Sequence, residues 1–402
     1  MKICYITNLY PPYMLGGAEL VVQKMAQQMK ERGHEVTVIT TSPTKKEEQT
    51  LDNEIPVYRI NPTKIYPVYQ QTNKNKLLKP LWHMSDLWNN KSLTEIKEIL
   101  QKINPDIVHI NNYKGLSVSC FKAPKELKIP IVFTPHDFSL ICPRANLINK
   151  NSQRCKNQNK ICKTYIELQN KLLNNNIDLV ISPSQFIIDK FKENNLFKNT
   201  PTIKIPLGID KSSYKSTKTY ETIDIMYVGT LGKHKGVQTL ITAFKHIPSP
   251  DIRLHIVGKG PDQEEFKQIA SNDKRIIFHG FIENENVIKL IETANMMVVP
   301  SICYDNSPVV INESFITGTP VIGSKIGGIP ENIHENVNGY LFEPENHDEL
   351  KDHIIDLIKN TYVLKSLEKG AFNTVPDNSM DIMGEKLLKE YNKLINKIKP
   401  TI

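Results

Sequence analysis

Short runs rich in valine and isoleucine alternate with helix-like runs along the whole chain. In the first half, the runs with the length and β-branched content of strands cover residues 2–7, 35–40, 56–60, 106–110, 129–134, 178–182 and 202–205. Between them, residues 18–31, 93–103 and 185–193 carry apolar side chains at helical spacing. Several strands are apolar almost throughout, which is typical of parallel strands covered on both faces.

The second half repeats this alternation. Its strand candidates are residues 224–228, 253–257, 275–279, 296–300 and 320–322, and its helix candidates are 237–246, 264–270, 284–292 and 309–317. Repeated strand–helix units predict a right-handed, doubly wound parallel sheet, and there are two series of them. The predicted fold class is therefore α/β, with two Rossmann-like domains that face each other across a cleft.

The domain boundaries follow from this alternation and from one polar stretch. We expect a first domain over residues 1–205, a second over 206–380, and a C-terminal basic helix over 381–402 that packs back on the first domain. Residues 206–222 are polar and lack periodicity, so they are the predicted hinge.

The composition is that of a soluble globular protein, with 39% hydrophobic and 23% charged residues among 402. No apolar run approaches the length of about 20 residues that a membrane-spanning helix needs. The N-terminal apolar stretch is too short for a signal-peptide core and is interpreted as a first strand. We therefore expect a cytoplasmic protein, and the six cysteines suit that reducing compartment.

The net charge of +8 is shared unevenly. Residues 1–205 hold 29 Lys and Arg against 17 Asp and Glu, whereas the remaining residues hold 22 against 26. A basic first half indicates an anionic partner, such as a lipid phosphate, the inner face of a membrane or a phosphorylated acceptor. A solvated lysine-rich surface explains the same excess, and both interpretations stay open. No nucleic-acid-binding module is recognisable.

Two regions lack periodicity, residues 61–90 and residues 138–163, and we expect acceptor choice to reside there. The second carries Cys142, Cys155 and Cys162 at wide spacing. Because a zinc site would need a fourth ligand and tighter pairs, the spacing favours free thiols over a zinc or redox staple.

The most informative stretch is residues 300–331, PSICYDNSPVVINESFITGTPVIGSKIGGIPE. A strand runs into a loop, and a helix is predicted to begin with Ser307 as its N-cap and Pro308 at its first position. The amides of Val309 and Val310 would then lie at a helix N-terminus, whose partial positive charge suits a diphosphate.

Asp305 and Glu313 bracket this predicted helix start. Asp305 in the loop can meet a sugar, and Glu313 in the helix can bind vicinal hydroxyls. Alone, the pattern is better explained by a capped helix with two solvated acids.

The whole stretch resembles the family 4 retaining glycosyltransferases of the GT-B fold, whose signature is two glutamates separated by seven residues. The resemblance implies that Glu313 binds the nucleotide ribose and that Asp305 lies against the donor sugar. Asp305 departs from the pattern, since it is one methylene shorter than glutamate. Asn306 and Ser307, followed by proline, replace the common Gly-Phe-Gly as in a recognisable subgroup, and we expect both to contact the donor.

The same resemblance extends to VGTLGKHKG at residues 228–236. Family members use an arginine and a lysine there to hold the donor diphosphate. Lys235 matches the lysine, whereas Thr230 stands where the arginine is expected. Lys233 is a further cation, although a surface lysine is the better interpretation of it.

Three further positions carry the resemblance. Gly16 and Gly17 look like the glycine-rich loop after the first strand, which contacts the donor phosphate or the acceptor. His136, in Thr-Pro-His-Asp at a strand end, matches a histidine close to the donor sugar and the reacting bond. Ile282 follows a strand where family members place backbone near the nucleotide base.

The resemblance implies a metal-independent transfer without a cofactor, and with retention of anomeric configuration. The donor would be a nucleotide-sugar, UDP- or GDP-linked, and the acceptor a glycan, a lipid-linked or a small molecule in polysaccharide or glycoconjugate synthesis. Peripheral membrane contact through the basic first domain is a further expectation.

Three other classes were weighed. A nucleotide-sugar epimerase can share the architecture, but it would form product from the donor alone. A nicotinamide oxidoreductase needs a fuller glycine fingerprint than VGKGP at residues 257–261. A two-lobed sugar-binding protein would normally be exported. All three are weaker hypotheses than glycosyl transfer.

Overall fold

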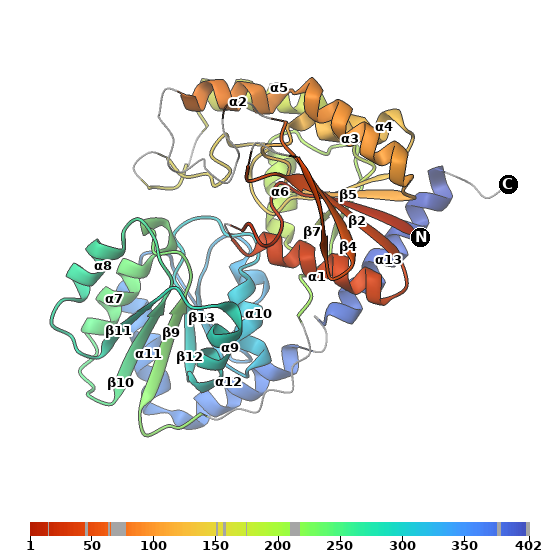
Figure 1. The fold of residues 1–402 in the computed structure, drawn as a ribbon. Helices are drawn as coiled ribbons and strands as arrows, with labels where there is room; N and C mark the ends of the chain where they lie inside the picture. The colour runs from red at the N-terminus through yellow and green to blue at the C-terminus, as the bar shows by residue number, and fades with distance from the viewer. Residues whose placement is uncertain are drawn as a thin grey trace. The chain divides into compact units, whose positions relative to one another are not determined.

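The computed structural model describes residues 1–14, 16–44, 47–62, 65, 78–149, 152–155, 158–173, 175–209, 218–375 and 379–398. The chain forms two units, each built around one parallel sheet with helices on both faces (Figure 1). The first unit comprises Met1–Asn146, Asn157–Leu207 and Met380–Ile402, and the second comprises Leu147–Lys156 and Gly208–Ser379. Residues 210–217 of the predicted hinge lie outside the described residues.

The first unit holds an eight-stranded sheet in the order β3-β4-β2-β1-β5-β6-β7-β8. Its strands are β1 (Lys2–Ile6), β2 (Glu35–Thr41), β3 (Glu48–Asp52), β4 (Ile55–Ile60), β5 (Ile107–Asn111), β6 (Ile131–Thr134), β7 (Leu179–Ser182) and β8 (Thr202–Lys204). Only β3 pairs antiparallel, with β4, among the described strands. The helices are α1 (Ala18–Glu31), α2 (Lys79–Leu87), α3 (Asn90–Ile103), α4 (Lys122–Glu126), α5 (Lys160–Leu173), α6 (Gln185–Glu193) and α13 (Met380–Ile398).

The second unit holds a six-stranded sheet in the order β11-β10-β9-β12-β13-β14, and every pair in it is parallel. The strands are β9 (Ile223–Val228), β10 (Ile252–Val257), β11 (Ile276–Gly280), β12 (Met296–Val299), β13 (Val321–Ser324) and β14 (Gly339–Phe342). The helices are α7 (Val237–Lys245), α8 (Gln263–Ala270), α9 (Asn284–Thr293), α10 (Val309–Ile316), α11 (His347–Lys359) and α12 (Thr361–Thr374). The prediction of an α/β fold with two doubly wound parallel sheets is thus confirmed.

Strands β9, β10, β12 and β13 contribute to two apolar cores, one on each face of the sheet. In β9, Ile225 and Tyr227 enter one core and Met226 enters the other, because successive side chains of a strand point to opposite faces. Coverage on both faces explains why these strands are apolar at nearly every position.

The chain ends on a helix of the first unit. In α13, Met383, Leu387 and Tyr391 are buried, and α13 lies against α1. The Tyr391 hydroxyl lies 2.5 Å from Nδ1 of His109, in the middle of β5, so α13 is tied into the sheet by a buried hydrogen bond. No helix of the described residues is long and apolar enough to span a membrane.

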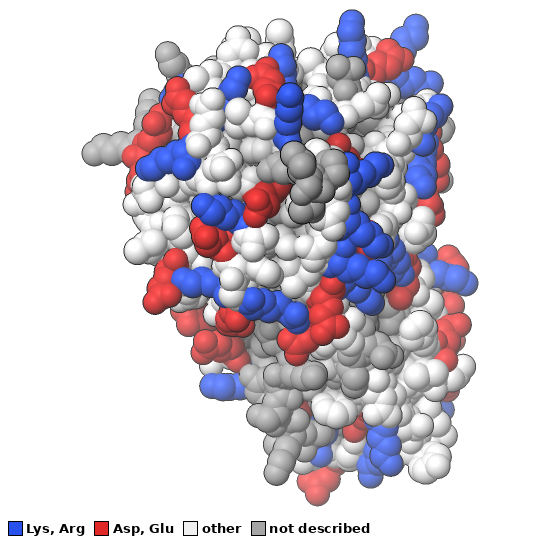
Figure 2. All heavy atoms as spheres, turned by 90° about the vertical axis from the view of Figure 1, so that its right-hand side faces the viewer, with Lys and Arg blue, Asp and Glu red and all other residues white. Residues whose placement is uncertain are grey.

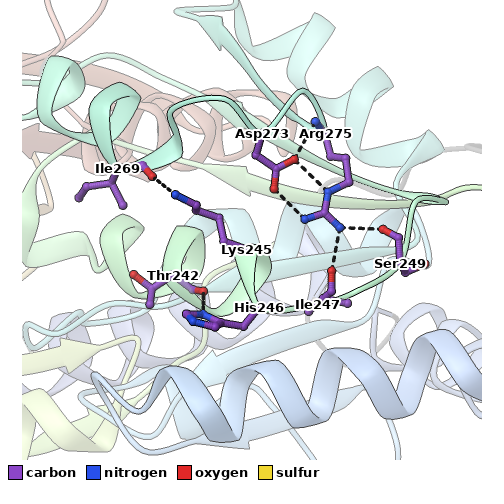
Figure 3. A network of polar contacts seen from close by, with 8 residues as sticks. All are labelled: Thr242, Lys245, His246, Ile247, Ser249, Ile269, Asp273 and Arg275. Atoms are coloured by element: carbon purple, nitrogen blue, oxygen red, sulfur yellow. Dashed lines mark hydrogen bonds and ion pairs between the residues drawn. The ribbon is translucent and has the colours of Figure 1, made fainter.

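One polar network holds the edge of the second sheet together (Figure 3). Arg275, just before β11, donates to the carbonyls of Ile247 and Ser249 at 2.8 and 2.7 Å and pairs with Asp273 at 2.7 Å. Its guanidinium carbon lies 4.9 Å from the ring centre of Phe244 in α7. A single side chain therefore joins the loop after α7 to the start of β11.

Replacing Arg275 with methionine should lower the free energy of unfolding by about 2 kcal/mol, because two carbonyls and a carboxylate lose a charged donor. Urea denaturation measures this change. Arg253→Met is the matched control, since Arg253 is exposed on β10, and it should change stability by less than about 0.5 kcal/mol. Equal effects of the two substitutions would contradict the anchoring role.

Candidate functional site

The strand order of the second sheet reverses between β9 and β12. These strands are neighbours although strands β10 and β11 and helices α7, α8 and α9 separate them in sequence. In open α/β sheets, ligands bind outside the carboxyl ends of the strands at such a switch point. The loops that leave this point are residues 229–236 after β9 and residues 300–308 after β12.

An ion pair joins these two loops. Nζ of Lys235 lies 2.5 Å from Oδ1 of Asp305, and Oδ2 of Asp305 accepts a hydrogen bond of 2.5 Å from Ser301. The two charged side chains are 28% and 16% exposed, so most of their hydration is lost. The structure thus brings together two residues 70 positions apart that the sequence had suggested separately.

The pair keeps both partners charged. Burial by itself lowers the pKa of Lys235, but the Asp305 carboxylate outweighs burial and raises that pKa above its ordinary value. Burial likewise acts to raise the pKa of Asp305, and Lys235 outweighs it, so the carboxyl pKa is held below its ordinary value. A fixed ammonium group therefore stands at the switch point.

Two glycines allow the loops to close around this pair. Gly236 has φ +72°, and a Cβ there would lie 1.8 Å from the carbonyl oxygen of Pro300. Gly327 has φ +63°, and a Cβ there would lie 2.3 Å from the carbonyl oxygen of Asp305. Both positions demand glycine for conformation and for space.

The N-cap of helix α10 lies one residue later than predicted. Pro308 occupies the N-cap position, and no side chain caps the helix, so the prediction that Ser307 is the N-cap is wrong. Proline fixes φ near the helical value and ends the loop, which leaves the serine outside the first turn. The amides of Val309 and Val310 open the helix, as the sequence suggested.

The other residues predicted around this helix are half-buried. Asn306 and Ser307 lie in the loop, and Glu313 lies in the second turn of α10. Ile282, after β11, packs against the apolar core that includes Val257. These positions all lie at or near the carboxyl edge of the second sheet.

The two remaining candidates in this unit, Lys233 and Thr230, contribute no free charge to the site. Lys233 is an exposed lysine whose Nζ lies 2.8 Å from Glu265, which agrees with its interpretation as a surface residue. Thr230 is exposed, and its carbonyl accepts a hydrogen bond of 2.9 Å from Tyr227. The threonine side chain therefore supplies no charge where the family pattern has an arginine.

In the first unit, two asparagines hold His136. Its Nε2 lies 3.0 Å from Oδ1 of Asn111, and its backbone N–H donates to Oδ1 of Asn112 at 3.1 Å. Burial lowers the pKa of His136 to about 4, so the imidazole is neutral near pH 7. When Nε2 of the neutral ring carries the proton, this N–H donates a hydrogen bond to Oδ1 of Asn111, and Nδ1 keeps a lone pair.

Asn111 is itself a residue that sequence reasoning missed. It ends β5 with a fully buried side chain, and among the described residues its Nδ2 has no hydrogen-bond partner. Buried amide groups are normally satisfied, so this unpartnered amide makes Asn111 a candidate functional residue. Its position beside His136 is the only signal, and that position is not visible in the sequence.

Gly16 and Gly17 stand before α1, after the strand that starts the chain. The Gly16 amide donates to Oε2 of Glu19 at 3.1 Å, which ties this loop to the first turn of α1. Gly17 has φ −84°, an ordinary value, and a Cβ on Gly16 would meet nothing closer than 3.8 Å. The local backbone therefore does not demand glycine at either position.

A buried charged cluster, which was not predicted, lies beside the loop that follows β6. Asp86 of α2 is 5% exposed, and its Oδ1 accepts a hydrogen bond of 2.6 Å from the amide of Gly115. Lys114 is also buried and donates to the carbonyl of Pro143. Burial raises the pKa of Asp86 to about 6 and also raises the pKa of Asp137.

The cysteines of this region are all free thiols. Cys142 is buried, and Cys155 and Cys162 are partly exposed. No group of three or more metal-ligating side chains occurs in the part of the chain that the structure describes.

Each half of the chain matches the model of a protein family. Residues 15–213 match the model described as Glycosyltransferase Family 4, and residues 209–374 match the model described as Glycosyl transferases group 1. Together with the two parallel sheets, these matches identify the chain as a GT-B glycosyltransferase of the family 4 type.

Two relatives with known names align with almost the whole chain. The chain is 25% identical to N-acetyl-alpha-D-glucosaminyl L-malate synthase of Bacillus anthracis over 98% of this chain and 97% of that protein. It is 24% identical to alpha-monoglucosyldiacylglycerol synthase of Acholeplasma laidlawii, over 99% and 98%. A solved structure of Anabaena HepE in complex with UDP-glucose has a TM-score of 0.72 at 19% identity, over 98% and 100% of the two chains, which shows the shared fold.

The buried carboxyl of Asp86 gives a pH dependence that can be measured. Because its folded pKa of about 6 lies above the unfolded value, the folded state binds the proton more tightly, and stability falls as pH rises through this range. Asp86→Asn removes this effect and can still accept the Gly115 amide. Between pH 5 and pH 7.5 the wild type should lose about 1.4 kcal/mol relative to the variant.

Urea denaturation of both proteins at the two pH values measures the difference, in which titrating groups that do not interact with Asp86 cancel. A difference between variant and wild type that is the same at pH 5 and pH 7.5 would show that the Asp86 pKa is not raised.

Proposed function

We propose that the chain is a retaining, metal-independent glycosyltransferase that moves a hexose-type sugar from a nucleotide-sugar to an acceptor hydroxyl. The single observation that carries this proposal is the Lys235–Asp305 pair at the switch point of the second sheet, immediately before the uncapped start of α10. A glycosyltransferase of this fold needs a place where a diphosphate is held before and during its departure.

The charges at this place suit a diphosphate. The ammonium of Lys235 and the amides of Val309 and Val310 are positive groups that are fixed before any ligand arrives. Since no side chain caps α10, an anion there replaces no protein group. In this proposal, fixed protein charge takes the part that a metal ion has in other transferases.

Asp305 then acts mainly through Lys235. One carboxylate oxygen meets the ammonium and the other meets Ser301, so a sugar hydroxyl would have to share an oxygen with one of these partners. The shorter aspartate places its carboxylate directly against Lys235 and fixes the position of the ammonium. Glu313, in the second turn of α10, is proposed to bind the ribose hydroxyls, and Asn306, Ser307 and Ile282 to line the donor.

The transfer step needs little covalent chemistry from the protein. The bond between the sugar C1 and the phosphate oxygen breaks, and its electron pair leaves with the diphosphate. The acceptor oxygen forms its bond to C1 on the same face, and its proton passes to the departing phosphate oxygen. The protein orients the reactants and stabilises the charge that develops on the diphosphate.

His136 is proposed to accept a hydrogen bond from a sugar hydroxyl. With a pKa near 4 it is neither a strong base nor a cation at neutral pH. Because Asn111 contacts Nε2 of the ring, Nδ1 is left as the acceptor. We therefore assign Asn111 the role of a positioning residue. Gly16 and Gly17, which the local backbone does not require, are proposed to let a phosphate or the acceptor approach closely.

The donor and acceptor are proposed in broader terms. UDP or GDP is the proposed nucleotide, and the UDP-glucose bound to HepE is consistent with the first of these. The names of the two relatives include a malate and a diacylglycerol, which supports small-molecule and lipid acceptors besides glycans. We place the enzyme in polysaccharide or glycoconjugate synthesis at the inner face of a membrane. No observation on the described residues favours the epimerase hypothesis.

Lys235→Met should weaken binding of the nucleoside diphosphate by about tenfold to a hundredfold, because a charge-assisted contact to phosphate is lost. Binding of the matching nucleoside, which has no phosphate, should change little. Isothermal titration with UDP and uridine, or GDP and guanosine, measures both. Lys233→Met is the control, because Lys233 is exposed and paired with Glu265.

Two outcomes of this titration would count against the proposal. If Lys235→Met and Lys233→Met lose affinity equally, Lys235 is not the diphosphate ligand. If EDTA abolishes binding of the nucleoside diphosphate, the proposed metal independence is wrong.

Asn111→Asp should raise the pKa of the His136 ring by about 1–3 units, because a carboxylate then faces Nε2 and stabilises the imidazolium. The wild-type ring should stay neutral from pH 5 to pH 8. NMR titration of the histidine rings measures this, and a His136→Gln variant identifies the signal.

Asn112→Asp is the matched control, because Asn112 meets the backbone amide of His136 and not the ring. A wild-type His136 that titrates at an ordinary pKa, or an Asn112→Asp variant that shifts the ring equally, would refute the positioning role of Asn111.

A further inference from the structure

The outward faces of α2 and α5 carry an apolar surface that the proposed transfer does not use. Twelve large apolar side chains of the described residues are exposed, and five of them lie on or directly before these two helices. They are Leu78, Leu81 and Met84 at α2, and Ile161 and Leu168 on α5. Single exposed apolar residues are normal, whereas a group on neighbouring elements marks a contact surface.

The two helices are neighbours in the first unit. Both pack on the same short helical segment, η3 (Val118–Phe121), and Figure 1 draws them side by side on one side of that unit. The five apolar side chains therefore belong to one region of the surface, which we call the α2–α5 surface.

These side chains are not needed for packing inside the unit. In α2, Trp82 and Asp86 face inward at a spacing of four, and Trp82 is fully buried. Leu81 and Met84 lie on the opposite side and are 55% and 68% exposed. A helix with apolar side chains on both its inward and its outward face is typical of one that packs against a second apolar partner.

Helix α5 follows the same pattern. Ile166 and Leu173, seven residues apart, are buried, whereas Ile161 and Leu168 form a second stripe and are 76% and 42% exposed. Each helix thus has one apolar face in the core and another on the surface.

Positive charge borders the apolar stripe. Lys160, Lys163 and Lys171 are exposed on α5, and none of them pairs with a carboxylate among the described residues. Some other lysines of the first unit do pair, as in Lys30–Glu54 and Lys97–Glu126. Acidic side chains lie among the basic ones on the face drawn in Figure 2.

We propose that the α2–α5 surface docks the first unit on an anionic lipid bilayer. Apolar side chains beside unpaired lysines fit the boundary between acyl chains and anionic headgroups, where each group finds its preferred partner. This inference rests on the proposed function, because a lipid-linked acceptor has to be met at a bilayer. It adds the surface that makes the contact and the charge of the lipid.

The test is sedimentation of the full chain with vesicles of phosphatidylcholine and phosphatidylglycerol in equal parts, and with vesicles of phosphatidylcholine alone. The wild type should bind the anionic vesicles and bind the neutral ones at least about tenfold more weakly. The double variant Leu81→Asn, Ile161→Asn should reduce the partition coefficient on anionic vesicles by about tenfold or more.

Leu51→Asn is the matched control, because Leu51 is 72% exposed on β3 and lies outside the α2–α5 surface. It should leave vesicle binding unchanged. All substituted positions are exposed, and unchanged melting temperatures verify that the variants fold.

Three outcomes would overturn the inference. They are an absence of binding to anionic vesicles, equal loss with Leu51→Asn, and a wild-type dimer in light scattering that the double variant converts to a monomer. The last result would assign the surface to a second copy of the chain. Because vesicle binding needs neither donor nor acceptor, its failure is distinguishable from a failure of the proposed transfer.

Discussion

The second unit depends on a nearly buried ion pair between loops that are distant in sequence. Removing two charges from water costs several kcal/mol for each ion, and their attraction restores this only with good geometry. Lys235 and Asp305 have that geometry, with 2.5 Å between Nζ and Oδ1 and a serine on the other carboxylate oxygen. An ion pair with this desolvation cost is expected where the charge itself has a function.

The surrounding backbone is shaped to keep the pair in place. Gly236 and Gly327 lie with positive φ against the carbonyls of Pro300 and Asp305, so a side chain at either position would push the loops apart. The strand order brings β9 and β12 together and places both loops at the carboxyl edge of the sheet. The strand order, the two glycines and the ion pair thus all act at the carboxyl edge of the sheet. This place lies next to the N-terminus of α10, which no side chain caps.

Much of this arrangement could be predicted from the sequence, and the failures have physical reasons. Buried parallel strands are apolar at most positions, so most parallel strands of both sheets were predicted within a few residues, although β14 was missed. Strand β3 was missed because it is an exposed polar edge strand, EQTLD, without alternation. Helix α2 was missed because its apolar residues lie on both faces and obscure the helical period.

The site was predictable as a set of residue types but not as a set of contacts. The family pattern pointed to Lys235 and Asp305 separately, whereas their pairing depends on which strands are neighbours. Asn111 beside His136 is likewise a consequence of β5 lying next to β6. The N-cap at Ser307 was wrong because the proline that follows it takes the cap position itself.

The most direct measurement is a crystal structure of the chain with its nucleoside diphosphate bound. Diphosphate oxygens should lie within hydrogen-bond distance of the Lys235 ammonium and of the first amides of α10. A nucleotide bound in the same crystal at another place, with Lys235 and the start of α10 left without phosphate, would contradict it.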